Sequence, residues 1–343
     1  MSDFYVFLVS MLLTFVLMPF NIYASKKFGF VDVPKDNRRM HTNAVPTIGG
    51  ISIFVSIMAI TLIFVPLNKR LASILIGATI IAGTGFIDDI KNLKPLHKML
   101  GQILAAAIAV YGGVSINVIS NPIHAGKLID MGIIGPIITM IWIVGVTNAL
   151  NFVDGLDGLC GGLAAISALT FYFASEEISY IALVSLILAG SVIGFLPYNF
   201  NPAKIFMGDT GALLLGYMLA CISVEGVVKS VATMSLIMPI FILALPVFDT
   251  LFAMIRRIIN KQKIMSADKG HLHHRLVQKG YSVKQTVIIL YVISILFSLL
   301  GLFVSKVEPS IAIVISTLAL IIVIMVGVLF GFFKSSNQDN KRS

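Results

Sequence analysis

The chain has 343 residues, of which 57% are hydrophobic and 12% are charged, and its formal net charge at pH 7 is +9. Its mean hydropathy of +0.97 is far above that of soluble globular domains. The composition therefore predicts an integral membrane protein. Its 2 cysteines both lie near apolar segments, so the sequence supports neither a disulfide framework nor a thiolate metal site.

Apolar runs recur along the whole chain, and a run of about 20 residues crosses a hydrocarbon layer of roughly 30 Å as a helix. Eleven such runs predict an all-α polytopic membrane protein, and the short fourth run leaves ten spans as an alternative. The runs cover residues 3–22, 47–67, 71–87, 99–112, 133–150, 159–174, 179–196, 211–228, 232–255, 286–305 and 311–333.

The basic residues predict the orientation. Twenty of the 25 Lys and Arg residues fall in alternate loops, which places these loops in the cytoplasm and the N-terminus outside. We expect one transmembrane catalytic domain over residues 1–333, with a long cytoplasmic loop at 256–285 and a polar cytoplasmic tail at 334–343. The remaining positive charge suits anionic lipids and substrates, and no nucleic-acid partner is predicted.

Six aspartates lie near the predicted cytoplasmic ends of spans. A carboxylate in the bilayer centre costs about 3 kcal/mol on insertion scales, so six at one face indicate a shared site. Oxygen ligands without thiols suit Mg²⁺ or Mn²⁺ carried with phosphate. Helix capping and the ion coupling of a secondary transporter are the alternative interpretations. The six are Asp88, Asp89, Asp154, Asp157, Asp209 and Asp249.

The stretch GFIDDIKNLKPLHK ends the third run with Asp88 and Asp89, and Lys98 follows. Adjacent side chains on a helix are about 100° apart, so both carboxylates can face one cleft only where the helix ends. We interpret the pair as groups that accept a proton from, or orient, an acidic substrate while a lysine stabilises its charge. An interfacial belt of Asp and Lys is the structural alternative.

The stretch NALNFVDGLDGLCGG places Asn148, Asn151, Asp154 and Asp157 at intervals of three. On a straight helix this spacing drifts by about 60° per step, while glycines such as Gly155 let the backbone break. Non-helical backbone at membrane depth is tolerated where it lines a wet cavity. The stretch therefore predicts a binding wall, with a plain turn between spans as the alternative.

Two further aspartates mark other ends of spans. Asp209, in FMGDTG, lies directly before an apolar run, where exposed amides can bind phosphate and a carboxylate can hold a bridging metal ion. A simple N-cap is the alternative. Asp249, in ALPVFDT, lies within a run, and we place it with His41 of the first cytoplasmic loop in a second tier of site residues.

The long loop contains SADKGHLHHRL, with His271, His273, His274 and Arg275. A zinc site is disfavoured because neither a cysteine nor an obvious fourth ligand accompanies the histidines. Imidazole and guanidinium groups suit phosphate or sugar hydroxyls, whereas a solvated loop is the alternative.

These motifs, FIDD, NxxNFVDGLDG, FMGDTG, FDT and HLHHRL in this order, resemble those of the polyprenyl-phosphate N-acetylhexosamine-1-phosphate transferases. The resemblance implies transfer of a sugar 1-phosphate from a UDP-sugar to undecaprenyl phosphate, with Mg²⁺ or Mn²⁺, at the cytoplasmic leaflet of a bacterial membrane. UMP would be released. Direct attack by the lipid phosphate and a covalent phosphosugar intermediate are both compatible with the motifs.

Residue roles follow from the matching positions. The resemblance implies that Asp88 and Asp89 lie near the lipid phosphate, that Lys98 contacts it, and that Asp209 binds the metal. It places the polar residues of NALNFVDGLDG along the nucleotide cleft and His271, His273, His274 and Arg275 near the sugar pyrophosphate.

The histidine spacing bears on the donor. His-x-His-His resembles the branch that uses UDP-GlcNAc and primes teichoic acid, O-antigen or related envelope polymers. The phospho-MurNAc-pentapeptide transferase branch, which has three consecutive histidines, is the alternative. The predicted partners are the two substrates and the lipid bilayer. A homodimer is also compatible with the sequence.

Overall fold

A computed structural model of the chain describes residues 3–32, 45–120, 128–175, 180–228, 237–262 and 270–329. Within these residues the fold is all-α apart from two short antiparallel hairpins. The helices are α1 (Asp3–Phe28), α2 (Gly50–Phe64), α3 (Lys69–Lys91), α4 (Pro95–Tyr111), α5 (Ile134–Val153), α6 (Leu159–Ala174), α7 (Tyr180–Asn199), α8 (Gly208–Val228), α9 (Ile237–Ile242), α10 (Ala244–Ile259), α11 (Leu272–Gln278), α12 (Val283–Val304) and α13 (Pro309–Leu329). The hairpins pair β1 (Val31–Asp32) with β2 (Val45–Pro46), and β3 (Val118–Ser120) with β4 (Leu128–Asp130).

The helices confirm a multi-pass membrane protein. Within the described residues, 6 helices are long and apolar enough to cross a membrane, namely α1, α3, α5, α7, α12 and α13. The shorter apolar helices α2 and α6 lie among them. Every predicted run contains helix, but the total number of spans and their orientation stay predictions.

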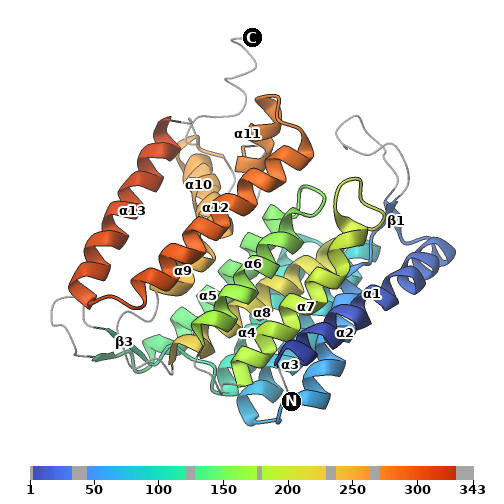
Figure 1. Cartoon of the computed structure of the whole chain (residues 1–343), viewed down its shortest axis with the longest axis horizontal. Helices are drawn as coiled ribbons and strands as arrows, with labels where there is room; N and C mark the ends of the chain where they lie inside the picture. Colours follow the sequence, from blue (N-terminus) through green and yellow to red (C-terminus); the bar gives the residue numbers. More distant parts are fainter. Residues whose placement is uncertain are drawn as a thin grey trace.

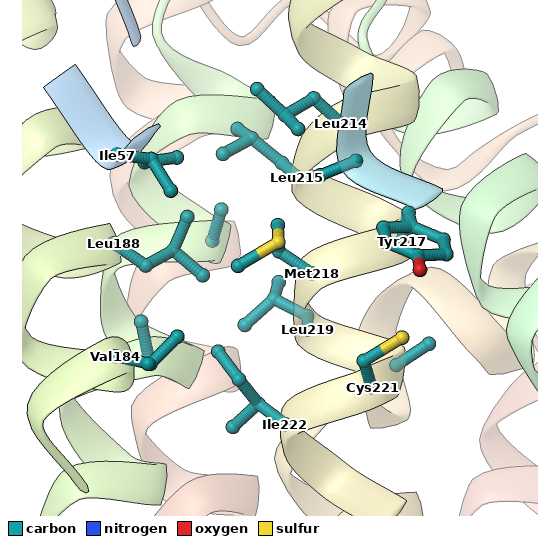
Figure 2. Close-up of a cluster of buried hydrophobic side chains, with 14 of the residues drawn as sticks. Ile57, Val184, Leu188, Leu214, Leu215, Tyr217, Met218, Leu219, Cys221 and Ile222 are labelled. Carbon is teal, nitrogen blue, oxygen red and sulfur yellow. The ribbon is translucent and has the colours of Figure 1, made fainter. Parts of the chain in front are cut away.

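Helix α8 forms the centre of the bundle. It packs against α2, α3, α5, α6 and α7, and its residues 211–222 are apolar and buried on all sides. Figure 2 shows Leu215, Met218 and Leu219 of α8 facing Ile57 of α2 and Leu188 of α7. A helix that is apolar all round has to be enclosed by others, which explains its central place.

The start of α8 is clamped between two neighbouring helices. A Cβ atom added at Gly50 of α2 would lie 2.2 Å from the nitrogen of Gly211, and one added at Gly85 of α3 would lie 2.5 Å from the nitrogen of Thr210. Only glycine allows backbones to approach this closely. The first turn of α8 is therefore held against both helices.

The two ends of the bundle differ in Figure 1. The end at the top carries α11 and β1, whereas the start of α1 and the β3 hairpin lie at the bottom. Helix α13 lies at the side of the bundle and packs on α12. Five of the aspartates singled out in the sequence line one cavity with residues of α11, and Asp249 contacts His271 at the start of α11.

The predicted run at residues 232–255 does not form one continuous helix in the residues described there. Helix α9 ends at Ile242 and α10 begins at Ala244. Pro246 has no N–H to donate to the carbonyl of Ile242, and it is tolerated in the first turn of α10, where amides lack intrahelical partners. The Ser167 hydroxyl donates to the freed Ile242 oxygen at 3.2 Å.

Candidate active site

A cavity of about 1240 Å³ opens between the ends of α3, α5 and α8. Eight of the predicted site residues line it: Asp88, Asp89, Lys98, Asn151, Asp154, Asp157, Asp209 and His274. One side of the cavity is apolar, with Phe28 and Phe30 from the first helix and its hairpin, and Phe206 before α8. The cavity thus joins a polar floor to an apolar wall.

Lys98 connects three predicted site residues at the floor. Its Nζ atom lies 3.0 Å from Asp88 Oδ2, 2.6 Å from Asp209 Oδ1 and 3.2 Å from Asn151 Oδ1. Asn151 also donates to Asp209. One ammonium group therefore links two carboxylates that come from residues 121 positions apart in the chain.

The turn between α3 and α4 brings Lys98 to this place. Asn92 adopts a left-handed conformation (φ 49°) and ends α3, and Pro95 occupies the first turn of α4. Asparagine tolerates this conformation and proline suits a helix start, so the reversal is encoded locally. Asp88 reinforces it, because its Oδ1 accepts from the Leu93 amide at 2.6 Å.

Asp89 faces α8 instead of Lys98. Its Oδ1 accepts from the Asp209 amide at 2.7 Å, and its Oδ2 accepts from the Thr210 amide at 3.1 Å and the Thr210 hydroxyl at 2.6 Å. These amides belong to the first turn of α8, where no intrahelical acceptor exists. Asp89 therefore caps α8 from a neighbouring helix.

The segment 154–158 joins α5 to α6 and forms another wall. Asp157 Oδ2 accepts from Asn201 Nδ2 at 3.0 Å and from the Ala203 amide at 3.1 Å. Burial raises the pKa of Asp154 to about 8, and the negative charges of Asp209, Asp89 and Asp157 add to this shift. Asp154 is therefore largely protonated at pH 7.

Further contacts hold the same segment in place. Gly158 has a left-handed backbone (φ 81°) as the N-cap of α6, and its amide donates to Asn199 Oδ1 at 3.0 Å. The hydroxyl of Tyr291 in α12 donates to the carbonyl of Gly158. Helices α7 and α12 therefore position the wall that carries Asp154 and Asp157.

The histidine segment lies beside this wall. Asp249 Oδ2 lies 2.9 Å from His271 Nδ1. The His273 and His274 rings are 4.1 Å apart, and a Cβ atom added at Gly155 would lie 2.4 Å from His273 Nε2. Burial, followed by the charge of His274, lowers the pKa of His273 to about 3, so its ring is neutral at physiological pH.

Several predicted residues lie away from the cavity formed by the described chain. Asn148, one turn before Asn151, pairs with Gln102, which accepts from Asn148 Nδ2 at 2.5 Å. His271, His273, Arg275 and Asp249 lie behind His274 and are not among the lining residues. His41 lies outside the described residues, so its predicted role stays a prediction.

Sequence reasoning missed four residues that shape the site, namely Asn199, Asn201, Phe206 and Tyr291. Asn199 and Asn201 lie in the polar stretch YNFNPAK, directly after an apolar run and before FMGDTG. This position could have indicated their role. Tyr291 lies within an apolar span and carries no such signal.

The donor set suits a hard divalent cation. Six carboxylates line the described cavity, from Asp32 and the five predicted aspartates, against one lysine. Among the described residues, no three His, Cys, Asp or Glu side chains could hold a metal ion by themselves. Mg²⁺ commonly uses only one or two carboxylates together with water and substrate phosphates, so Asp209 and its neighbours fit that mode of binding.

Comparison with known proteins agrees with this arrangement. The model of "Glycosyl transferase family 4" matches residues 71–227. The probable undecaprenyl-phosphate N-acetylglucosaminyl 1-phosphate transferase of Bacillus subtilis is 38% identical over 85% of this chain and 82% of its own. The undecaprenyl-phosphate alpha-N-acetylglucosaminyl 1-phosphate transferase of Thermotoga maritima is 33% identical, over 86% and 87%.

A relative of the other branch matches as well. The phospho-N-acetylmuramoyl-pentapeptide-transferase of Geobacillus kaustophilus is 31% identical over 86% of this chain and 95% of its own. These relatives are transferases, which disfavours the transporter interpretation. The chain belongs to glycosyl transferase family 4, together with the polyprenyl-phosphate sugar 1-phosphate transferases.

Proposed function

We propose that the protein transfers N-acetylglucosamine 1-phosphate from UDP-GlcNAc to undecaprenyl phosphate, giving undecaprenyl-diphosphate-GlcNAc and UMP. The observation that carries the proposal is the junction of Asp88, Lys98 and Asp209 at the start of α8, inside a membrane protein. The two GlcNAc 1-phosphate transferase relatives support the choice of donor over the pentapeptide-bearing one. The product would prime an envelope polymer such as teichoic acid or O-antigen.

The cavity end of the bundle would face the cytoplasm of a bacterial cell, where the nucleotide is available. The excess of Lys and Arg in loops at this end supports this orientation. The apolar wall of the cavity suits the membrane-embedded acceptor, whereas the polar floor suits phosphate groups. The enzyme would thus act in the cytoplasmic membrane.

The chemistry requires two anions to meet. An oxygen of the lipid phosphate forms a bond to the β-phosphorus, the bond from that phosphorus to the bridging oxygen breaks, and UMP leaves with that oxygen. Lys98 would reduce the repulsion. Asp88 would take the proton from the lipid phosphate, because Asp89 is occupied by α8.

A divalent cation, Mg²⁺ or Mn²⁺, would be held by Asp209 and Asn151. When bound it neutralises the diphosphate and stabilises the leaving UMP. The same Asp209 oxygen contacts both Lys98 and Asn151. The Asp209 carboxylate could therefore bind either the metal ion or the Lys98 ammonium group. Attack through a covalent phosphosugar on one of the aspartates is the competing pathway.

Release of UMP tests the proposal. Membranes containing the protein, supplied with UDP-GlcNAc, undecaprenyl phosphate and Mg²⁺, should release UMP and form a lipid-linked sugar. No UMP, or equal release after chelation of the metal, would refute it. UDP-MurNAc-pentapeptide should not serve as donor, and its use would instead support the alternative branch.

A further inference from the structure

Asp249 has no place yet in the proposed reaction. It lies in α10, its side chain is 9% exposed, and it is not among the described residues that line the cavity. A buried carboxylate needs strong partners, because desolvation of its charge is costly. Both of its oxygens have such partners in the histidine segment.

The partners lie at the start of α11. Asp249 Oδ1 accepts from the Leu272 amide at 2.8 Å, and Oδ2 lies 2.9 Å from His271 Nδ1. A carboxylate oxygen accepts hydrogen bonds, and the His271 tautomer with its proton on Nδ1 can donate to it. His271 is the N-cap residue of α11, yet its own side chain makes no capping hydrogen bond. Asp249 therefore caps α11 from another helix.

This cap matters because α11 has only 7 residues. A helix of two turns is not stable alone in water, so its position depends on tertiary contacts. Helix α10 supplies a second contact close by, since a Cβ atom added at Gly270 would lie 2.5 Å from Arg256 Cζ. Leu272 adds an apolar contact to the cluster around Leu159 and Leu290.

Helix α11 in turn places His274 in the cavity wall. The His271 and His273 rings stack in parallel 5.8 Å apart, and His273 lies 4.1 Å from His274. A displacement of the α11 start would move all three rings together. Asp249 thus acts at a distance on the part of the cavity that carries His274.

We propose that Asp249 is a positioning residue for the nucleotide-sugar, which acts through His271 and the α11 N-terminus to hold His274 in the cavity wall. The proposal rests on the proposed function for its choice of donor. The role of Asp249 in holding α11 can be measured by a structural assay that does not depend on enzyme activity. The acceptor lipid meets the Asp88 side of the cavity and should be unaffected.

The test uses the full-length protein in lipid nanodiscs with the substitution Asp249→Asn. Asparagine keeps the volume of the side chain but removes its charge, so the contact with His271 is no longer a charge-assisted hydrogen bond. We expect the KM for UDP-GlcNAc to rise about tenfold and kcat to change less than about threefold, as for loss of one charged hydrogen bond in binding. The KM for undecaprenyl phosphate should stay within about twofold of its value in the parent protein.

Amide hydrogen exchange supplies the readout independent of activity. Residues 272–278 should exchange faster in Asp249→Asn, while α8 and α3 keep their protection. The matched control is Thr250→Val, since the Thr250 hydroxyl is buried without a hydrogen-bond partner in the described chain. This control should match the parent protein in both assays.

A second pair of variants tests the same contact from α11. His271→Asn keeps a donor near the Nδ1 position and should keep the exchange protection of α11, whereas His271→Ala should lose it. Unchanged protection in both Asp249→Asn and His271→Ala would overturn the proposal, as would a loss confined to kcat. If the parent protein released no UMP, the proposed function would fail, yet the exchange results would still decide whether Asp249 holds α11.

Discussion

Asp88→Asn and Asp89→Asn should damage the protein in different ways, although the residues are adjacent and the substitutions identical. Asp88 contacts Lys98 in the cavity and Asp89 contacts the first turn of α8. Asp88→Asn should therefore reduce turnover with little effect on stability. Asp89→Asn should mainly reduce stability.

The size of each effect follows from the contacts. In Asp89→Asn an NH₂ group replaces one of the two carboxylate oxygens. Depending on the orientation of the amide, the lost acceptor is the one for Thr210 or the one for the Asp209 amide. A hydrogen bond to a charged group contributes about 1.5 to 3 kcal/mol, and the negative charge at the helix start adds up to about 2 kcal/mol. Relief of the buried charge offsets part of this, so we expect a loss of about 3 kcal/mol. At about 2 °C per kcal/mol for a large domain, Tm should fall by about 6 °C.

Asparagine at 88 keeps the acceptor for the Leu93 amide, and Lys98 keeps its contact with Asp209. The stability change should therefore be smaller than for Asp89→Asn. Loss of a general base typically lowers turnover by about 10² to 10⁴-fold, and we expect kcat to fall within that range.

Two measurements on the same preparations separate the variants. Thermal unfolding in nanodiscs reports Tm, and UMP release below that temperature reports kcat. The expected pattern is a large kcat loss with a normal Tm for Asp88→Asn, and a lowered Tm for Asp89→Asn with residual turnover in the cold. Equal Tm and equal kcat losses in both variants would refute the division of roles.

Three further outcomes are expected. Asp209→Asn should abolish metal-dependent UMP release while the protein still inserts, and unchanged activity would remove Asp209 from the metal site. Gly155→Ala should raise the KM for UDP-GlcNAc several-fold, because its methyl group would meet His273 at 2.4 Å; an unchanged KM would show that the wall can yield. His273 has a pKa of about 3 when folded and about 6.5 when unfolded, so its stability contribution is present above pH 6.5 and is lost as pH falls toward 3. The loss should reach about 2 kcal/mol at pH 5, and denaturant midpoints should show a weaker pH dependence for His273→Asn.

The sequence predicted the membrane class and the helices well, because hydropathy and length are local properties of the chain. It also predicted eight residues of the cavity wall. Six of them are carboxylates and amides near the ends of apolar runs, where they are costly and therefore conspicuous. The break at Leu243 was missed because Pro246 lies inside a run whose hydropathy stays high. The partners of Asp89 and Asp249 could not be predicted from local sequence. The partner of Asp89 lies 120 positions away along the chain, and that of Asp249 lies 22 positions away.

Two helix starts at the site share one arrangement, which explains why aspartates are so frequent there. Asp209, in the first turn of α8, turns its carboxylate to Lys98, and His271, the N-cap of α11, turns its ring to Asp249. Neither side chain caps its own helix, so the exposed amides need acceptors from elsewhere. Asp89 of α3 and Asp249 of α10 supply them. Because the capping carboxylate of α8 comes from a neighbouring helix, Asp209 is free to face the cavity, and the two caps lock α8 and α11 to the bundle.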